Sequence, residues 1–237
     1  MTQLFNRIRG DDRHGRVTQI MALVRGRSGE PARSILATLT GANLERFDRD
    51  ARVEAVRLAA SLGLVVRLSL NFLPRTLDSL PDAIDSTLEA MKVAGLLASQ
   101  LILEVTEDDL IRDPSGFAAR INAYRTYGLL LALDDFGAGY AGLNLLADFQ
   151  PDIVKLDMHL VRDIDGHGPR QAIVKAIVAA CRDLGLDVLA EGVETEREFR
   201  WLARRGINLF QGYLFGKPAL ASLPSAYFPP TVLVAAS

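Results

Sequence analysis

The segment that decides the expected fold is Leu129-Leu130-Leu131-Ala132-Leu133-Asp134-Asp135-Phe136-Gly137-Ala138-Gly139-Tyr140. Its apolar run is too short for a typical helix and ends in a glycine-rich turn, so it predicts a strand buried on both faces. Asp134 and Asp135 stand where this strand ends. Two adjacent carboxylates there repel each other unless a hard divalent cation, a shared proton or a basic partner neutralises them. Taken alone, the pair fits a solvated turn as well as it fits a metal site.

The same pattern recurs along the chain, because other apolar runs also end at a polar or charged residue. Strands are expected at 65–71, 100–105, 129–135, 152–156, 187–190 and 207–210, alternating with helices at about 82–95, 114–127, 140–148, 167–185 and 195–205. Strand followed by helix, repeated with short loops, predicts right-handed βαβ units, and a closed parallel barrel gathers such strand ends at one rim. The polar residues at these ends are Asn71, Glu104, Asp134, Asp135, Lys155, Asp157, Glu191, Glu194 and Gln211.

The N-terminal part predicts an antiparallel hairpin before the alternation begins, with strands at Leu4 to Ile8 and Arg16 to Arg25 and a turn at Gly10-Asp11-Asp12. A chain of 237 residues fits one α/β barrel of about 250 residues better than two small domains. The expected parts of this single domain, 1–237, are a hairpin over 1–25, βα repeats over 26–218 and a tail over 219–237 that includes a last helix fragment.

A longer helix is expected from Asn43 to Leu62, before the first strand of the repeats. It carries a cluster of charged residues, which the spacing predicts to be a solvated face with pairs four residues apart. These residues are Arg46, Asp48, Arg49, Asp50, Arg52 and Glu54.

Composition excludes several classes of function. A net charge of −2 shows no excess of basic residues of the kind that binding to a nucleic-acid polymer requires. No apolar run approaches the ~20 residues of a membrane-spanning helix. Cys181 is the only cysteine, so an internal disulfide is impossible and a reducing cytoplasm is the default expectation. The histidines, His14, His159 and His167, show no paired spacing, which favours oxygen-bound Mg²⁺, Mn²⁺ or Ca²⁺ over zinc.

Five motifs follow one another along the chain: Glu104-Val105-Thr106-Glu107, Asp134-Asp135-Phe136-Gly137, Lys155-Leu156-Asp157, Ala190-Glu191-Gly192-Val193-Glu194 and Gln211-Gly212-Tyr213. With these motifs in this order, the chain resembles the EAL-domain family of cyclic-di-GMP phosphodiesterases. The runs Ala22 to Gly26 and Gly137 to Leu146 are most similar to EAL domains attached to blue-light flavin sensors. The resemblance covers essentially the whole chain and implies a modified (β/α)8 TIM-type barrel whose first strand is antiparallel.

The resemblance also implies two Mg²⁺ or Mn²⁺ ions, with Ca²⁺ inhibitory. Asn71, Glu104 and Asp134 would hold one ion, and Asp134, Asp135 and Glu191 the other. Two such cations lower the pKa of a shared water and offset charge on the leaving oxygen, so the product would be the linear dinucleotide.

Further roles follow from the same resemblance. Lys155 would polarise the attacking water, with Glu191 and Glu194 as its catalytic partners. Leu23, Arg25, Asp157 and Gln211 would contact the nucleotide, and the planar fork of Arg25 suits a phosphodiester. Glu107, Phe136 and Gly137 would support a loop that contacts the second subunit of a homodimer.

One position departs from the family pattern. The name-giving Glu-Ala-Leu motif reads Met21-Ala22-Leu23 here, so the glutamate is absent. Residues 21, 23 and 25 share one face of a strand, and a thioether is a poor ligand for hard cations, so the first metal should bind much more weakly. The early Gln-Pro-Ile segment of the family is also altered, to Asn6-Arg7-Ile8, which is expected to weaken guanine recognition.

Three hypotheses of different class remain open. The chain is an impaired phosphodiesterase, a cyclic-di-GMP receptor that does not cleave, or a partner-binding module that has lost the nucleotide and uses the barrel surface. The third ranks last, because a site without a task gains nothing from a cluster of costly buried charges. A protein partner that supplies the input signal is also expected.

Overall fold

The computed structural model describes residues 2–10, 16–26, 28–110, 113–139, 143–223 and 225–229. The expected turn residues Asp11 and Asp12 lie outside these ranges, as do residues 140–142 at the start of one expected helix.

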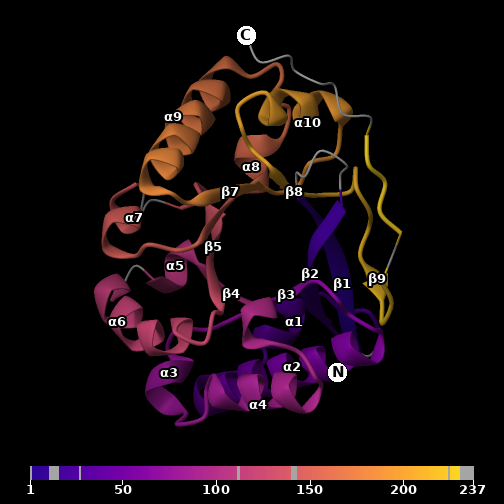
Figure 1. The fold of residues 1–237 in the computed structure, drawn as a ribbon, viewed down its shortest axis with the longest axis vertical. Coiled ribbons are helices and arrows are strands. Elements are labelled where there is room, and N and C mark those ends of the chain that lie inside the picture. Colours follow the sequence, from indigo (N-terminus) through magenta and orange to yellow (C-terminus); the bar gives the residue numbers. More distant parts are fainter. Residues whose placement is uncertain are drawn as a thin grey trace.

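Eight strands surround the centre of the molecule and helices cover them from outside (Figure 1). The strands are β1 Thr2–Gly10, β2 Arg16–Arg25, β3 Arg67–Asn71, β4 Leu101–Thr106, β5 Leu130–Phe136, β6 Ile153–Leu156, β7 Asp187–Ala190 and β8 Leu209–Gln211. Strands β2 to β8 are parallel neighbours in chain order, whereas β1 pairs antiparallel with both β2 and β8. Strand β1 therefore closes the sheet into a barrel, and the expected (β/α)8-type fold with an antiparallel first strand is confirmed.

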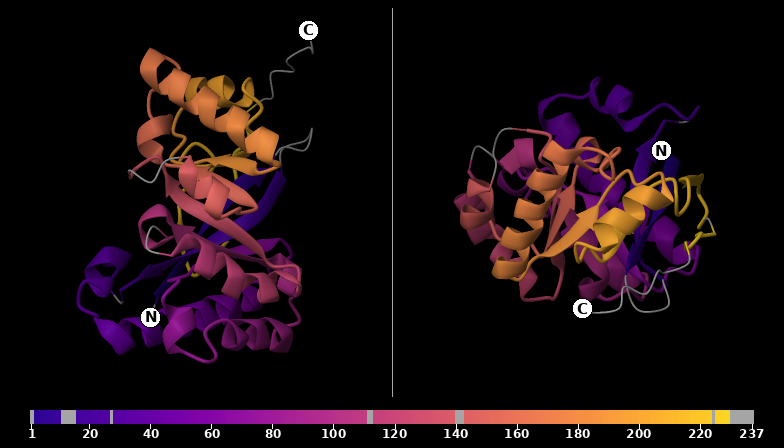
Figure 2. Two further views of the ribbon diagram at one scale, coloured as in Figure 1. Left: turned by 90° about the vertical axis from the view of Figure 1, so that its left-hand side faces the viewer. Right: turned by 90° about the horizontal axis from the view of Figure 1, so that it is seen from above.

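The helices pack around this barrel as Figure 2 shows from two further directions. They are α1 Ala32–Leu36, α2 Gly41–Ser61, α3 Thr76–Ser79, α4 Asp85–Val93, η1 Ala98–Gln100, α5 Glu107–Leu110, α6 Pro114–Arg125, α7 Asn144–Asp148, α8 Met158–Val161, α9 Gly168–Leu184 and α10 Glu196–Ala203. Gly185 ends α9 in the left-handed conformation that glycine favours. None of the helices in the described ranges has the length and apolar character needed to cross a membrane.

Alternation along the strands divides the core into two layers. One apolar cluster fills the space between the sheet and the helices, and Leu101, Leu103 and Val105 of β4 belong to it. A second, smaller cluster fills the barrel interior and consists of Met21, Ile102, Ala132, Ile153 and Leu189. Since side chains two positions apart on a strand share a face, the residues two positions later on these strands also turn inward, at the rim of the barrel.

The C-terminal segment differs from the expected helix fragment. Ala219–Leu220 forms strand β9, which pairs antiparallel with β1 beside β8. The backbone N–H of Tyr227 then donates to the carbonyl of Phe215 at 2.8 Å. No helix follows Ala203 in the part of the chain that the structure describes, because this segment satisfies its backbone by pairing with the barrel edge.

Candidate metal centre

The ends of β4 to β7 bring four charged side chains together. Lys155 is 1% exposed, and its Nζ lies 2.7 Å from Glu104 Oε2, 2.7 Å from Asp134 Oδ1 and 2.8 Å from Glu191 Oε1. On each strand, the residue two positions earlier belongs to the interior apolar cluster, so alternation alone directs all four side chains inward. The structure thus gathers these four residues, which the sequence placed at four separate strand ends.

Burial controls the charges of this group. Burial alone would lower the pKa of Lys155, but Asp134, Glu104 and Glu191 raise it well above its ordinary value, so the ammonium stays charged. Burial raises the pKa of Glu191 to about 8, with Lys155 opposing the shift and Asp134 adding to it. The pKa of Glu104 is raised for the same reasons. The raised carboxyl pKa values show that one ammonium does not fully stabilise the charged forms of these carboxyl groups, which favours an additional cation.

The turn after β5 presents two of the carboxylates side by side. Asp135 has a φ of 54°, in the left-handed region, and its N–H donates to Asp134 Oδ1 at 3.0 Å. Oxygens of Asp134, Asp135 and Glu191 lie within 4.8 Å of one another. Three hard oxygen donors at this spacing fit a Mg²⁺ or Mn²⁺ ion, so the second of the two implied metal sets fits its ion.

The loop beyond Asp135 is tied to a neighbouring strand end. The Gly137 N–H donates to Glu107 Oε2 at 3.1 Å, and Glu107 itself is buried at the start of α5. Phe136 is buried in the core cluster between sheet and helices. Glu107 thus holds the backbone that follows the carboxylate pair; contact with a second subunit stays a prediction.

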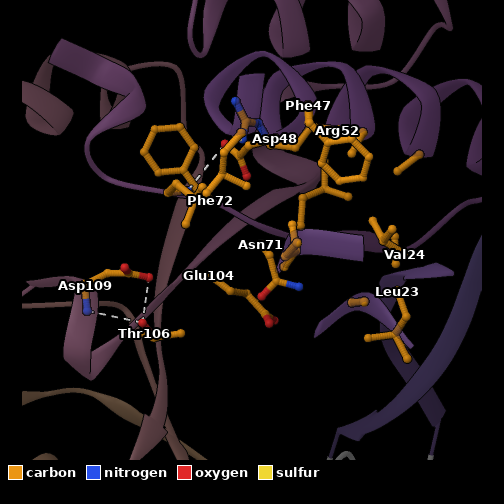
Figure 3. Close-up of a pocket in the computed structure, with 18 residues that line it drawn as sticks. Leu23, Val24, Phe47, Asp48, Arg52, Asn71, Phe72, Glu104, Thr106 and Asp109 are labelled. Atoms are coloured by element: carbon orange, nitrogen blue, oxygen red, sulfur yellow. Dashed lines mark hydrogen bonds and ion pairs between the residues drawn. The ribbon is translucent and has the colours of Figure 1, made fainter. Parts of the chain in front are cut away.

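The side of the mouth formed by β2 and β3 carries fewer charged groups than the side with the carboxylate pair. Met21 is 6% exposed, and its Sδ lies 3.6 Å from the Nε2 donor of Gln211. Asn71 ends β3 beside Glu104 and points toward it (Figure 3). Asn71 and the shared residues Glu104 and Asp134 offer oxygen here, as does the nearby amide of Gln211, whereas Met21 offers a sulfur. A thioether is a poor ligand for a hard cation, so this side fits the first implied metal less well than the acidic residues fit the second.

The predicted nucleotide contacts lie around this mouth. Arg25 ends β2, is half-buried, and donates from Nη1 to the Val24 carbonyl at 2.8 Å. Leu23 shares its strand face and is half-buried. Gln211 ends β8, and its buried Oε1 has no hydrogen-bond partner among the side chains and backbone that the structure describes. An amide oxygen with no partner at the rim is available to a ligand donor.

A cavity of about 250 Å³ opens beside these residues on the β6 to β8 side. It is lined by Asp135, Asp157, Met158, Glu191, Gly192, Glu194, Gln211, Gly212 and Tyr213. Glu194 lies exposed at its rim, where Arg162 donates to both of its oxygens at 2.7 and 3.0 Å. Glu194 therefore reaches the same cavity as Glu191 but is paired with an arginine instead of Lys155.

Two partners at the rim escaped the sequence analysis. His159 Nδ1 lies 2.7 Å from Asp157 Oδ1, and the His159 N–H donates to the same oxygen at 2.8 Å, because Asp157 caps the short helix α8. The other missed partner is Arg162, which ends this helix. A four-residue helix leaves no periodic pattern, so the only available signal was an Asp at a possible cap position.

Comparison with known proteins agrees with this geometry. The EAL domain family matches residues 9–218. The chain is 36% identical over 215 residues to the blue light- and temperature-regulated antirepressor BluF of Escherichia coli, covering 90% of this chain and 53% of that protein. It is 34% identical to the cyclic di-GMP phosphodiesterase NbdA of Pseudomonas aeruginosa, covering 86% of this chain and 27% of NbdA. The chain thus spans about half, or less, of these relatives.

Solved structures show the same barrel. A standalone versatile EAL protein from Vibrio cholerae in its c-di-GMP bound form superposes with a TM-score of 0.89 and 42% identity, covering 95% of each chain. The manganese/cy-diGMP complex of Klebsiella pneumoniae BlrP1 gives a TM-score of 0.86 and 41% identity, over 93% of this chain and 56% of that one. By its sequence, its barrel and the residues at the mouth, the chain belongs to the EAL domain family.

Proposed function

We propose that this chain binds cyclic-di-GMP at the mouth of its barrel and, with Mg²⁺ or Mn²⁺, hydrolyses it slowly to linear pGpG. The observation that carries the proposal is the convergence of Glu104, Asp134 and Glu191 on Lys155, next to Asp135. Relatives that include a cyclic di-GMP phosphodiesterase and structures with bound cyclic-di-GMP support the nucleotide assignment.

Binding would use the rim residues. Arg25 would grip a phosphate with its planar fork, and Leu23, on the same strand face, would pack against the ligand. Asp157 and the unpartnered Oε1 of Gln211 would accept hydrogen bonds from a guanine edge. These residues lie on β2, β8 and the loop after β6, so a ligand contacting all of them would span the mouth.

The acidic residues would hold the cations. Asp134, Asp135 and Glu191 would ligate one ion, and Asn71, Glu104 and Asp134 the other. When bound, such ions supply Lewis acidity toward the phosphate and a water of lowered pKa. Lys155 would hold the attacking water by donating to it, and Glu194 would stay at the rim, paired with Arg162. Ca²⁺ would occupy the oxygen set without supporting hydrolysis.

Met21 limits the chemistry in this proposal. Its buried thioether stands 3.6 Å from Gln211 Nε2, where it offers no charge to a hard cation. The same observation favours a second candidate, a receptor that binds cyclic-di-GMP without cleaving it. One relative is named an antirepressor and not a phosphodiesterase, which supports a candidate without hydrolysis, either this receptor or a partner-binding EAL module.

The setting we infer for this function is the cytoplasm, with a homodimer formed near the Glu107–Gly137 loop and a protein partner that supplies the signal. The single, buried Cys181 fits a reducing compartment, since burial raises the pKa of its thiol to about 11 and no disulfide is needed. The hydrogen bond from Gly137 N–H to Glu107 supports the loop that this dimer would use.

Calorimetry tests the binding proposal directly. We expect cyclic-di-GMP titrated into the chain with Ca²⁺ to give saturable heat, and Arg25→Met to lose most of the affinity. Arg182→Met is the matched control, because Arg182 is exposed on α9 and should bind the nucleotide as the unaltered chain does. Absence of binding by the unaltered chain, or equal binding by Arg25→Met, would contradict the proposal.

A further inference from the structure

Helix α2 contains a buried ion pair that the sequence did not predict. Arg52 is 2% exposed, and its Nη1 pairs with Asp48 Oδ2 one helical turn earlier. The expectation of a solvated charged face is wrong for these two residues, although Arg46, Asp50 and Glu54 of the same cluster are exposed. A buried pair needs its remaining hydrogen-bonding capacity satisfied, so its other partners show what the pair does.

Asp48 holds the segment that follows the Asn71 end of β3. Its Oδ2 accepts from the backbone N–H of Leu73 at 3.4 Å and lies 3.3 Å from the Thr76 hydroxyl, which donates to it. Leu73 stands two residues after Asn71, and Thr76 begins α3. Burial raises the pKa of Asp48, and the charge of Arg52 opposes that shift.

Arg52 holds the same segment from the other side. Its guanidinium lies 4.7 Å from the centre of the Phe72 ring, which allows a cation–π contact. Its Nη2 donates to the Ala83 carbonyl at 2.8 Å and its Nε to the Thr87 hydroxyl at 3.4 Å, both at or near α4. Phe72 directly follows Asn71, and its N–H donates to the Glu104 carbonyl at 2.8 Å. The pair thus bridges α2 and α4 to the residues that carry Asn71.

Packing alone does not fix this part of the mouth. A cavity of about 370 Å³ lies beside Asn71 and Glu104, and Leu23, Asp48 and Arg52 also line it (Figure 3). Strands β2 and β3 pair only as far as Met21 and Ser69, so Asn71 has no ladder partner on the β2 side. Pairing with Glu104 holds the Asn71 backbone on the β4 side, and the contacts of Asp48 and Arg52 supply support that is missing on the β2 side.

We propose that the Asp48–Arg52 pair is a positioning device that sets the Asn71 carboxamide opposite the Glu104 carboxylate at the mouth. It acts through the backbone of Phe72 and Leu73 and touches neither nucleotide nor metal itself. The inference rests on the proposed function, because the position of Asn71 matters only if its oxygen serves a cation.

The test compares variants of one helix for Mn²⁺ affinity, measured from free Mn²⁺ by electron paramagnetic resonance on the full chain. Asp48→Asn keeps the shape of the side chain and removes its charge, and Arg52→Met keeps the apolar stem. Arg49→Met is the matched control, since Arg49 links α2 to Asp82 through a more exposed pair. All variants are also made with Met21→Glu, in which the Asn71 side of the site regains a carboxylate.

We expect Asp48→Asn and Arg52→Met to weaken Mn²⁺ binding ~10–100-fold in the Met21→Glu chain, as loss of ligand-orienting contacts typically does. Amide hydrogen exchange at Leu73 should accelerate in both, whereas Arg49→Met should leave both readouts unchanged. Thr76→Val, which removes one hydrogen bond and keeps the ion pair, should give a smaller loss of affinity in the same direction. This variant serves as the test should the charge variants fail to fold.

The possible failures are distinguishable. If Asp48→Asn and Thr76→Val lower the melting temperature but leave the Mn²⁺ affinity of the folded protein unchanged, the pair is purely structural and the positioning role is wrong. If neither the unaltered chain nor Met21→Glu binds Mn²⁺, the proposed metal centre is wrong and the positioning role is overturned with it.

Discussion

The two halves of the barrel mouth belong to the same fold, but one is acidic and the other is electrically neutral. The acidic half, Asp134, Asp135 and Glu191, places three carboxylates within 4.8 Å of one another. The neutral half, Met21, Asn71 and Gln211, offers a thioether and two amides, and Gln211 Nε2 lies 3.6 Å from Met21 Sδ. Both halves stand on one continuous sheet, so the difference shows that the residues at the strand ends set the charge of the rim without a change of fold.

Backbone strain distinguishes the halves as well. Asp135 has a φ of 54° in the acidic half, and such a conformation costs energy for a residue other than glycine. Gly212, at the boundary of the halves, allows β8 to approach the Val193 backbone so closely that an added Cβ would lie 2.1 Å from its carbonyl oxygen. Strain at the carboxylate turn is expected where structure serves a site.

The largest expected effect is on Mn²⁺ affinity, which should fall more after a substitution in the acidic half than after one in the neutral half. Asp135→Asn should weaken the tightest Mn²⁺ site more than ~100-fold, because it removes a ligand charge, whereas orienting contacts alone cost ~10–100-fold. Asparagine tolerates the left-handed backbone at this position, so the fold should be unaffected. Asn71→Ala, in the weaker half, should change that affinity less than tenfold. A larger loss from Asn71→Ala than from Asp135→Asn, measured by Mn²⁺ titration, would reverse the comparison.

The next largest expected effect is the loss of stability caused by the substitution Gly212→Ala. Gly212→Ala should lower the free energy of unfolding by about 3 kcal/mol, since a methyl group cannot fit against Val193 without backbone movement. Gly185→Ala is the control, because Gly185 also has positive φ but has open space around it, and should cost only about 1–2 kcal/mol. Urea unfolding measures both. Equal losses of unfolding free energy in the two variants would mean that the positive φ alone causes the destabilisation, and not the close approach of β8 to the Val193 backbone.

The smallest expected effect is the pH dependence that Glu191 of the acidic half contributes. Because the pKa of Glu191 is raised to about 8, a cation that binds below this pH must displace its proton. Apparent Mn²⁺ affinity should therefore rise up to ~tenfold per pH unit from pH 6 to 8 and level off above, which titrations at several pH values measure. Glu191→Gln should bind more weakly and lose this slope. The same affinity at pH 6 and pH 8 would show that Glu191 is not a ligand.

The fold could be predicted from the sequence where apolar and polar residues alternate with the period of two that is typical of strands. The strand expected at 187–190 coincides with β7, and the one expected at 129–135 is displaced from β5 by one residue. Alternation then correctly placed Met21 on the inward face, where it joins the interior apolar cluster. Family motifs supplied the candidate ligands, and the structure brings the acidic ones together at one rim.

The sequence could not predict which charged side chains are buried. Asp48 and Arg52 stand four residues apart on a helix, and that spacing is the same for a solvated pair and for a buried one. Only the tertiary structure shows that α4 and the loop after Asn71 cover this turn of α2. The sequence also could not predict that Arg162 pairs with Glu194, because the two residues lie 32 positions apart and only the tertiary structure brings them together.

The most direct test of the account measures pGpG formation from cyclic-di-GMP by the unaltered chain and by Met21→Glu, side by side with Mn²⁺. We expect both proteins to bind the nucleotide and the Met21→Glu chain to hydrolyse it ~100-fold faster or more, because the neutral half regains a metal ligand. Equal rates in the two proteins would contradict the claim that the sulfur at position 21 limits the chemistry of this barrel.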